Sequence, residues 1–333
     1  MLSLQAAVDE VAARSGFSGV VRVDRAGTTE LSAAYGLADR AHGLPVTVDT
    51  RLATASATKG LTALTVMSLV ERGALGLGTT ARSLLGHDLP LVADDVTVEH
   101  LLAHRSGIGD YLDEEVHADV CDYVMPVPVH ELDTTESYLR VLDGHPTAFP
   151  AGERFEYNNG GYVVLALLAE RAAGTDFQTL VRTLVCEPAG MRDTAFLRSD
   201  ELPGDAALGY LTADGARTNV LHLPVLGSGD GGVYSTAADF AVFWDSLLAG
   251  RIVAPDRVAE MLRPRSERPG PKSYGLGFHV DVDGDLPWLE GYDAGVSFAS
   301  RHRTSTATTY TVISNWSDGA WPVLGVLDER LGR

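Results

Sequence analysis

The sequence has little positive charge. Its 333 residues include 26 lysines and arginines against 45 aspartates and glutamates, so the formal net charge is −19. This balance argues against nucleic acid as a partner and against adsorption to an anionic membrane, because both require a basic surface. No run approaches the roughly 18 consecutive apolar residues of a membrane-spanning helix. With 45% hydrophobic and 21% charged residues, the composition is that of a folded globular protein.

Cysteine is also scarce. Cys121 and Cys186 are too few for a disulfide scaffold or a cysteine-rich zinc site, so two unpaired thiols are predicted. The N-terminus lacks the basic stretch of a secretory signal, has acids at Asp9 and Glu10, and predicts the first turns of an amphipathic helix. We therefore expect a cytoplasmic protein, although a chain whose signal had been removed would look the same.

The chain has strand-like ends and a helical middle. Runs with β-type composition occur at 19–23, 28–31, 274–280, 295–300 and 308–314. Between them, helical stretches and long loops prevail from about Val96 to Leu248. This order predicts one sheet formed by both ends of the chain, with a mostly helical region inserted.

Two helices are predicted from apolar patterning. The first runs from about Ser56 to Arg72 and ends at Gly73; it is apolar almost all round, so we expect it to be central and buried. The second follows Gly160 and contains the apolar run 162–168. Each helix begins at a cluster of polar residues that can carry chemistry.

Ser56 and Lys59 form the first cluster. Residues at i and i+3 lie on one helical face, so the hydroxyl and the amine can meet. A serine is a poor nucleophile until a neighbouring base takes its proton, which a free lysine amine can do. The same helix start offers backbone N–H groups to an oxyanion. The structural alternative is an N-capping serine followed by a surface lysine, because S-x-x-K alone is a short pattern.

Tyr157 and Asn159 form the second cluster. In an extended segment, side chains at i and i+2 point the same way, so both can face one site. A tyrosine hydroxyl beside a cation can shuttle a proton, and an asparagine amide can hold a substrate carbonyl or fix a lysine. The structural alternative is a core tyrosine followed by a helix N-cap at Asn158 or Asn159.

Together the clusters resemble the penicillin-recognising serine hydrolases: class C β-lactamases, D-Ala-D-Ala carboxypeptidases and their esterase relatives. The S-x-x-K motif stands as Ser56-Ala-Thr-Lys59 and the Y-x-N motif as Tyr157-Asn-Asn159, in the order that this family has. The resemblance covers nearly the whole chain, and further segments that carry it are 98–107, 187–194, 231–236 and 274–277.

The family's third motif, Lys-Thr-Gly or His-x-Gly on a strand near the C-terminus, is altered in this chain. In the matching stretch 289–295, Gly291 fits the glycine, but Leu289 occupies the place of the lysine or histidine. The resemblance implies that the N–H of Tyr292 is the second oxyanion donor beside that of Ser56. Backbone donors survive a side-chain change, so acyl transfer can still occur, whereas recognition of a substrate carboxylate is put in doubt.

Two other patterns fail on inspection. The segment 295–299 nearly matches the nucleophile elbow G-x-S-x-G, but a turn and a strand follow it, and His302, the only later histidine, precedes the only later acids. His100 and His104 have the i,i+4 spacing of a metal pair but lack the glutamate of H-E-x-x-H. They are predicted to be structural, and no metal is expected.

The resemblance implies an α/β (α+β) protein of the β-lactamase/transpeptidase-like type. An antiparallel sheet from both chain ends, 1–95 and 226–333, is flanked by helices and lies beside a mostly helical region, 96–225. The two regions form one continuous catalytic unit, with the active site in the cleft between them.

The expected reaction is acyl transfer in two steps without a cofactor. Ser56, activated by Lys59 and Tyr157, attacks the carbonyl of a small ester or amide, and water resolves the acyl-enzyme. Three alternatives stay open: an acyltransferase that uses an alcohol or amine, a D-amino-acid peptidase or β-lactamase proper, and a binding module without catalysis. The oligomeric state is left open.

The substrate-binding residues that we expect are Asn159, Leu289, Gly291 and Tyr292. Because Leu289 cannot donate to an anionic group, weak or no β-lactamase activity is predicted. Arg301 and Arg303 follow the motif closely and can either replace the missing cation or serve as solvated surface residues.

Overall fold

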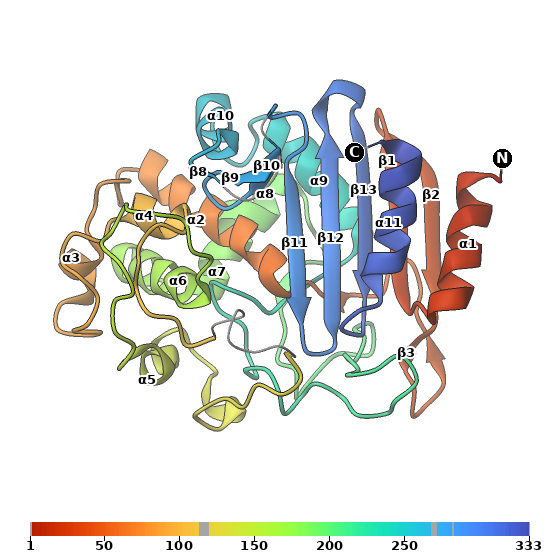
Figure 1. Cartoon of the computed structure of the whole chain (residues 1–333), viewed down its shortest axis with the longest axis horizontal. Helices are drawn as coiled ribbons and strands as arrows, with labels where there is room; N and C mark the ends of the chain where they lie inside the picture. The colour runs from red at the N-terminus through yellow and green to blue at the C-terminus, as the bar shows by residue number, and fades with distance from the viewer. Residues whose placement is uncertain (1, 113–119, 268–271, 282, 333) are drawn as a thin grey trace.

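The main sheet combines strands from both ends of the chain. The computed structural model describes residues 2–112, 120–267, 272–281 and 283–332. The strands of the sheet are β1 (Gly19–Arg25), β2 (Thr28–Tyr35), β8 (Ser266–Glu267), β9 (Lys272–Tyr274), β10 (His279–Asp281), β11 (Trp288–Asp293), β12 (Val296–Arg303) and β13 (Thr308–Ser314). They are antiparallel in the order β2-β1-β13-β12-β11-β10-β9-β8 (Figure 1). The predicted fold class and the sheet formed by both chain ends are confirmed.

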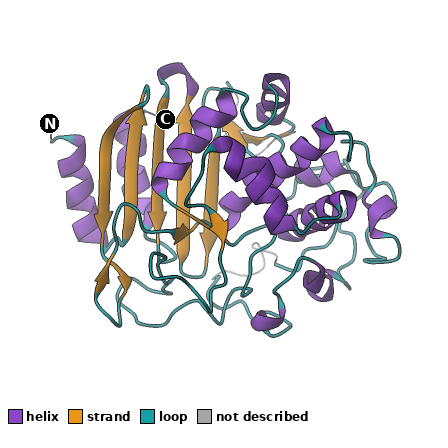
Figure 2. Ribbon diagram, turned by 180° about the vertical axis from the view of Figure 1, so that it is seen from behind, coloured by secondary structure: helices purple, strands orange, loops and turns teal. Residues whose placement is uncertain are grey.

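The sheet is covered on both faces, which explains its apolar central strands. Helices α1 (Leu4–Ser15) and α11 (Ala320–Leu331) lie on one face, and α9 (Ala237–Leu248) lies on the other (Figures 1 and 2). Successive strand residues point to opposite faces. Val20 and Ile313 therefore join the main core, whereas Val21 and Val312 join the smaller core beneath α1 and α11.

The remaining helices lie on the β11 side of the sheet (Figure 1). They are α2 (Thr58–Glu71), α3 (Ala81–Leu85), α4 (Val98–Leu102), α5 (Leu139–Leu142), α6 (Asn159–Ala173), α7 (Phe177–Val181), the π-helical turn η4 (Arg182–Cys186), α8 (Glu187–Ala189) and α10 (Pro255–Leu262). The predicted buried helix is α2, in which every residue from Thr58 to Leu69 is buried. It packs against α6, the second predicted helix.

Two details differ from the sequence-based expectations. The run 274–280 is not one strand: β9 and β10 are joined by a turn in which Gly277 has φ +88° and leaves no room for a Cβ, which would lie 2.1 Å from the Cβ of Ala63. Two small sheets also occur outside the main one. They pair β3 (Leu37–Asp39) with β4 (Leu44–Pro45), and β5 (Leu52–Ala53) and β6 (Ala195–Phe196) with β7 (Val233–Ser235).

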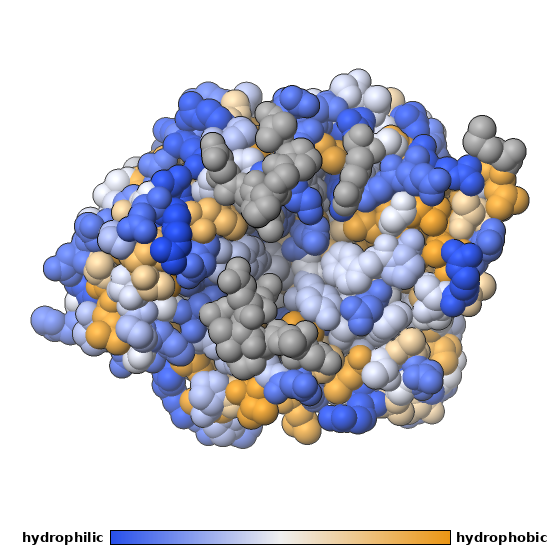
Figure 3. Space-filling view, viewed as in Figure 1, coloured by the Kyte–Doolittle hydropathy of each residue, from blue (hydrophilic) through white to orange (hydrophobic). Residues whose placement is uncertain are grey.

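The surface matches the acidic composition. The face seen in Figure 1 is largely hydrophilic, with hydrophobic side chains in scattered patches (Figure 3). Among the described residues, no helix is both long enough and apolar enough to span a bilayer. The division into 1–95, 226–333 and 96–225 stays a prediction.

Candidate active site

Ser56 lies in a tight turn immediately before α2. The turn is the 3-10 helix η1 (Ala55–Ala57), and the backbone N–H and hydroxyl of Thr54 both donate to the carbonyl of Val233 on β7, at 2.9 and 3.0 Å. Ala55 has φ +46°, a conformation that is uncommon for a residue with a Cβ and that concentrates at functional sites. The nucleophile candidate is therefore held by the strained start of a buried helix.

The amine of Lys59 has three partners. Its Nζ donates to Ser56 Oγ at 2.9 Å, to Asn159 Oδ1 at 2.7 Å and to the backbone carbonyl of Asp230 at 2.9 Å. The Asn159 amide is oriented by its own Nδ2, which donates to the carbonyl of Leu112 at 2.9 Å. Lys59 is only 1% exposed. The structure thus brings together Ser56, Lys59 and Asn159 from two helix starts.

Of the three partners of the Lys59 amine, only the Ser56 hydroxyl has a proton that it can give to the amine. A carbonyl oxygen can only accept a hydrogen bond, so Asn159 Oδ1 and the Asp230 carbonyl must each face an N–H of the amine. A free amine has two N–H groups and one lone pair. In the ammonium form Lys59 donates all three hydrogen bonds; in the free amine the contact with Ser56 reverses, because the lone pair can accept only from the hydroxyl. The geometry suits a base poised on the serine.

Tyr157 lies beside the same amine. The centre of its ring is 4.9 Å from Lys59 Nζ. The buried ring of His104 packs 4.3 Å from it, and His104 Nδ1 accepts the N–H of Asn158 at 3.1 Å. Asn158 is the N-cap of α6, accepting from the N–H of Gly161 at 2.6 Å. The capping role therefore falls on the residue between Tyr157 and Asn159, and the ring and the amide flank Lys59.

Gly291 brings β11 against the serine turn. A Cβ at this position would lie 2.1 Å from the carbonyl oxygen of Thr54 and 3.1 Å from the backbone nitrogen of Ser56, so only glycine fits. Strand β10 pairs with β11 at His279 and Trp288, near one end of β11. The expected oxyanion donors, the N–H groups of Ser56 and Tyr292, belong to these two neighbouring segments.

The side chains of β11 alternate between two environments. Leu289 is 2% exposed and packs on the first turn of α2, where a Cβ added to Gly60 would lie 2.6 Å from its Cδ2. Glu290 and Tyr292 line the cavity at Ser56, and Leu289 is not among the described residues that do so. Its role in substrate binding stays a prediction. Sequence reasoning missed Glu290, although the two-residue period of a strand was the signal that could have found it.

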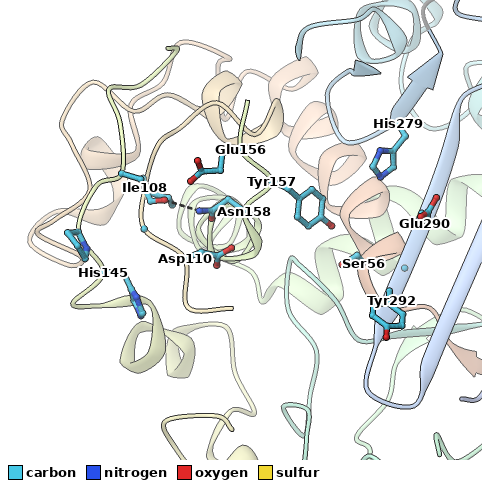
Figure 4. A pocket seen from close by; sticks show the side chains of 14 residues that line it. Ser56, Ile108, Asp110, His145, Glu156, Tyr157, Asn158, His279, Glu290 and Tyr292 are labelled. Atoms are coloured by element: carbon cyan, nitrogen blue, oxygen red, sulfur yellow. Dashed lines mark hydrogen bonds between the residues drawn. The ribbon is translucent and has the colours of Figure 1, made fainter. Parts of the chain in front are cut away.

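Ser56 lies between two cavities of different character. The larger, about 580 Å³, is also lined by Tyr157, Asp110, Glu156, Glu290 and His279 (Figure 4). The smaller, about 70 Å³, has a mainly apolar lining that includes Tyr111, Leu112, Val120, Tyr138, Val225, Tyr234 and Val296. Ser56 and Tyr292 line both cavities, so a substrate held at Ser56 can extend into each.

Asp110 lines the larger cavity and Asp230 lines the smaller one, and sequence reasoning missed both acids. The Asp110 carboxylate accepts the N–H groups of Asn159 and Gly160 at 2.7 and 2.8 Å and so holds the first turn of α6. Burial raises the pKa of Asp110 to about 7. Burial also raises the pKa of Asp230, whose carboxylate accepts the hydroxyl of Tyr111.

Asp110 predicts a pH-dependent stability. Its pKa rises from 3.8 to about 7 on folding, so the folded chain binds more protons than the unfolded chain between these values. The free energy of unfolding should fall as pH rises through this range, by about 3 kcal/mol between pH 5 and pH 8. Urea unfolding at both pH values checks this, and the decline should be shallower in Asp110→Asn.

The control for this experiment is Asp94→Asn, which removes a carboxylate whose side chain is 89% exposed. This variant should keep the wild-type decline. An equally steep decline in Asp110→Asn would show that Asp110 is not the group responsible.

The remaining candidates have structural partners. Arg301 is 5% exposed and pairs with Asp328 on α11 at 2.8 Å, so it is neither a surface residue nor a cavity cation. Arg303 pairs with Asp285 at 3.0 Å. Ser297 lies within β12 and donates to the carbonyl of Trp316 at 2.9 Å, as expected for a strand rather than a nucleophile elbow.

Comparisons with known proteins find similarity along most of the chain. A family model described as Beta-lactamase matches residues 4–322. Esterase EstB of Burkholderia gladioli is 30% identical over 288 residues, which are 78% of this chain and 72% of the esterase. A D-aminopeptidase of Brucella anthropi is 28% identical over 330 residues, which are 93% of this chain but 59% of that longer protein. A crystal structure of a penicillin-binding protein from Bacillus halodurans has a TM-score of 0.91 at 33% identity, covering 98% of this chain and 100% of the other.

Proposed function

The chain belongs to the beta-lactamase family, and on that premise we propose that it is a serine hydrolase that cleaves small carboxylic esters or amides through an acyl-enzyme on Ser56. One observation carries the proposal. The Lys59 amine lies 2.9 Å from Ser56 Oγ, while its two other partners are carbonyl oxygens that can only accept. The free amine can therefore take the serine proton as Oγ attacks the substrate carbonyl.

The proposed reaction has two balanced steps. In the first, a bond forms between Ser56 Oγ and the carbonyl carbon, the bond from that carbon to the leaving oxygen or nitrogen breaks, and the serine proton passes through Lys59 and Tyr157 to the leaving group. In the second, water gives a proton to the same pair and attacks the acyl-enzyme, and Oγ recovers a proton as the carboxylic acid departs. The N–H groups of Ser56 and Tyr292 are the proposed oxyanion donors.

The two cavities suggest how the substrate lies. The leaving group has to be within reach of the group that protonates it, and Tyr157 lines the larger cavity. We therefore assign the leaving group to the larger cavity and the acyl chain to the smaller one. Because the smaller cavity is about 70 Å³ and mainly apolar, short acyl chains should be preferred.

The decisive experiment is hydrolysis of p-nitrophenyl esters of increasing chain length. Turnover of the acetyl and butyryl esters, and a protein mass increased by one acyl group after rapid quenching, would support the proposal. Product analysis with added alcohol or amine separates hydrolysis from transfer, since a transferase would give the new ester or amide instead of the acid. Absence of turnover and of an acyl adduct would favour a binding module.

Anionic β-lactams should be poorer substrates than neutral esters. Leu289 cannot donate a hydrogen bond, and the carboxylate of Glu290 lines the cavity where an anionic group would lie. Loss of a charge-assisted hydrogen bond costs about 1.5–3 kcal/mol, which is about 10–150-fold in discrimination. We expect kcat/KM for p-nitrophenyl butyrate to exceed that for nitrocefin by at least this factor.

The variant for this comparison is Leu289→Lys, with folding checked by circular dichroism because the side chain packs on α2. If the wild type hydrolyses nitrocefin efficiently and the lysine changes nothing, Leu289 does not set specificity.

A further inference from the structure

We propose that the leaving group of the natural substrate carries a positive charge, as in an ester of an amino alcohol, and that Glu290 recognises it. This inference rests on the proposed function and adds the chemical class of the substrate. It makes Glu290 a specificity-determining residue.

Glu290 lies in the cavity to which the leaving group is assigned. It lies between Leu289 and Gly291 on β11, and Gly291 touches the serine turn. Its side chain is half-buried and lines the larger cavity together with Ser56 and Tyr157 (Figure 4). By the assignment above, this is the cavity on the leaving-group side of the serine.

The two other carboxylates that line this cavity, those of Glu156 and Asp110, already have partners. Glu156 forms an ion pair with Arg154 at 3.0 Å. The carboxylate of Asp110 is turned to the N–H groups at the start of α6. Lys59 does not line this cavity, because its amine is held by three partners behind the serine.

Glu290 differs from these groups. In the part of the chain that the structure describes, no lysine or arginine forms an ion pair with its carboxylate, and none lines the larger cavity. A carboxylate in a half-buried position gains most from a cation that arrives with the substrate. The rings of Tyr157 and Tyr292 line the same cavity and can add cation–π attraction to an ammonium group.

The smaller cavity is less suited to a cation. It contains Asp230 and Asp293, but the Asp230 carboxylate accepts the Tyr111 hydroxyl, and burial raises its pKa. Asp293 accepts the N–H of Ala294 at 3.0 Å. The rest of the lining is mainly apolar, so the positive charge belongs on the leaving group rather than on the acyl chain.

A matched pair of thioesters tests the proposal. S-Butyrylthiocholine and S-(3,3-dimethylbutyl) thiobutyrate have the same shape and acyl group, but only the first carries a charge, and both release a thiol that a disulfide reagent detects. We expect the wild type to prefer the cationic thioester by at least ~10-fold in kcat/KM, the scale of one charge-assisted contact. In Glu290→Gln this ratio should fall toward one, and rising salt should lower it in the wild type.

Glu156→Gln is the control, because it removes another carboxylate from the lining of the same cavity. It should keep the wild-type ratio. A wild-type ratio near one, or an equal fall in both variants, would overturn the role of Glu290 while leaving the proposed hydrolysis intact.

If neither thioester nor p-nitrophenyl butyrate is hydrolysed, the proposed function itself fails. The cation site is then judged by calorimetry with choline. Binding to the wild type that is lost in Glu290→Gln supports the site, and absence of binding overturns it.

Discussion

Replacing Ser56 by alanine is expected to abolish ester hydrolysis, lowering kcat by at least about a thousandfold. The hydroxyl is the group that forms the covalent bond in the proposed reaction, and the Lys59 amine beside it cannot substitute for it without a second proton acceptor. The fold should survive, because the turn around Ser56 is held by the backbone and hydroxyl of Thr54. The measurement is steady-state hydrolysis of p-nitrophenyl butyrate, with thermal unfolding to show that the variant is folded.

Covalent labelling tests which serine is the nucleophile. A fluorophosphonate should modify the wild type on the peptide that contains Ser56, and should leave Ser56→Ala unmodified. Ser297→Ala is the informative control, because it tests the serine of the near-match to a nucleophile elbow; it should still be labelled. An adduct on Ser297, or undiminished hydrolysis by Ser56→Ala, would be incompatible with the proposed nucleophile.

Much of the local structure could be predicted from spacing alone. The apolar run after Lys59 and the run after Gly160 each identified a buried helix, and α2 and α6 occupy these segments. The polar residues at the two helix starts are 100 positions apart, yet Lys59 and Asn159 meet at 2.7 Å. Spacing predicted each pair separately, whereas the resemblance to a family was needed to join them.

The two-residue period of a strand groups Glu290 with Tyr292, but the sequence does not show which face of β11 meets the cavity. Leu289 is a predicted binding residue on this strand, because it occupies the place of the family's lysine or histidine. Whether a strand residue faces a helix or a cavity depends on how the strand is rotated against its neighbours. Here the close approach of Gly291 to Thr54 sets that rotation, turning Leu289 onto α2 and leaving Glu290 on the cavity.

The two acids beside the cavities, Asp110 and Asp230, could not be predicted from the sequence. Asp110 and Asp230 stand in loops without a motif around them, and a single acid in a loop is usually solvated. They become recognisable when the fold brings the two acids within electrostatic reach of each other, with Asp110 at the first turn of α6 and Asp230 at the hydroxyl of Tyr111. Long-range contacts of this kind carry no local signal in the sequence.

Lys59 and Tyr157 are expected to act as one unit in proton transfer. Lys59→Ala and Tyr157→Phe should each lower kcat/KM for p-nitrophenyl butyrate by about 10²–10⁴-fold, the usual scale for a positioned acid or base. Lys59→Met keeps most of the side-chain volume in a site that is 1% exposed, so it separates the loss of the amine from the effect of a cavity. Tyr157→Phe removes the hydroxyl and keeps the ring that packs on His104.

The double variant discriminates between a shared relay and two independent contributions. If Lys59 and Tyr157 pass the same proton, loss of either one breaks the path, and the double variant should be little worse than the more damaged single variant. Independent roles would instead multiply the two losses. We expect the shared relay, because the Lys59 amine lies close to both other groups. It is 2.9 Å from Ser56 Oγ and 4.9 Å from the centre of the Tyr157 ring. A single variant with near-wild-type kcat/KM would remove that residue from the relay, and multiplied losses would require separate proton paths for the attack and for the departure of the leaving group.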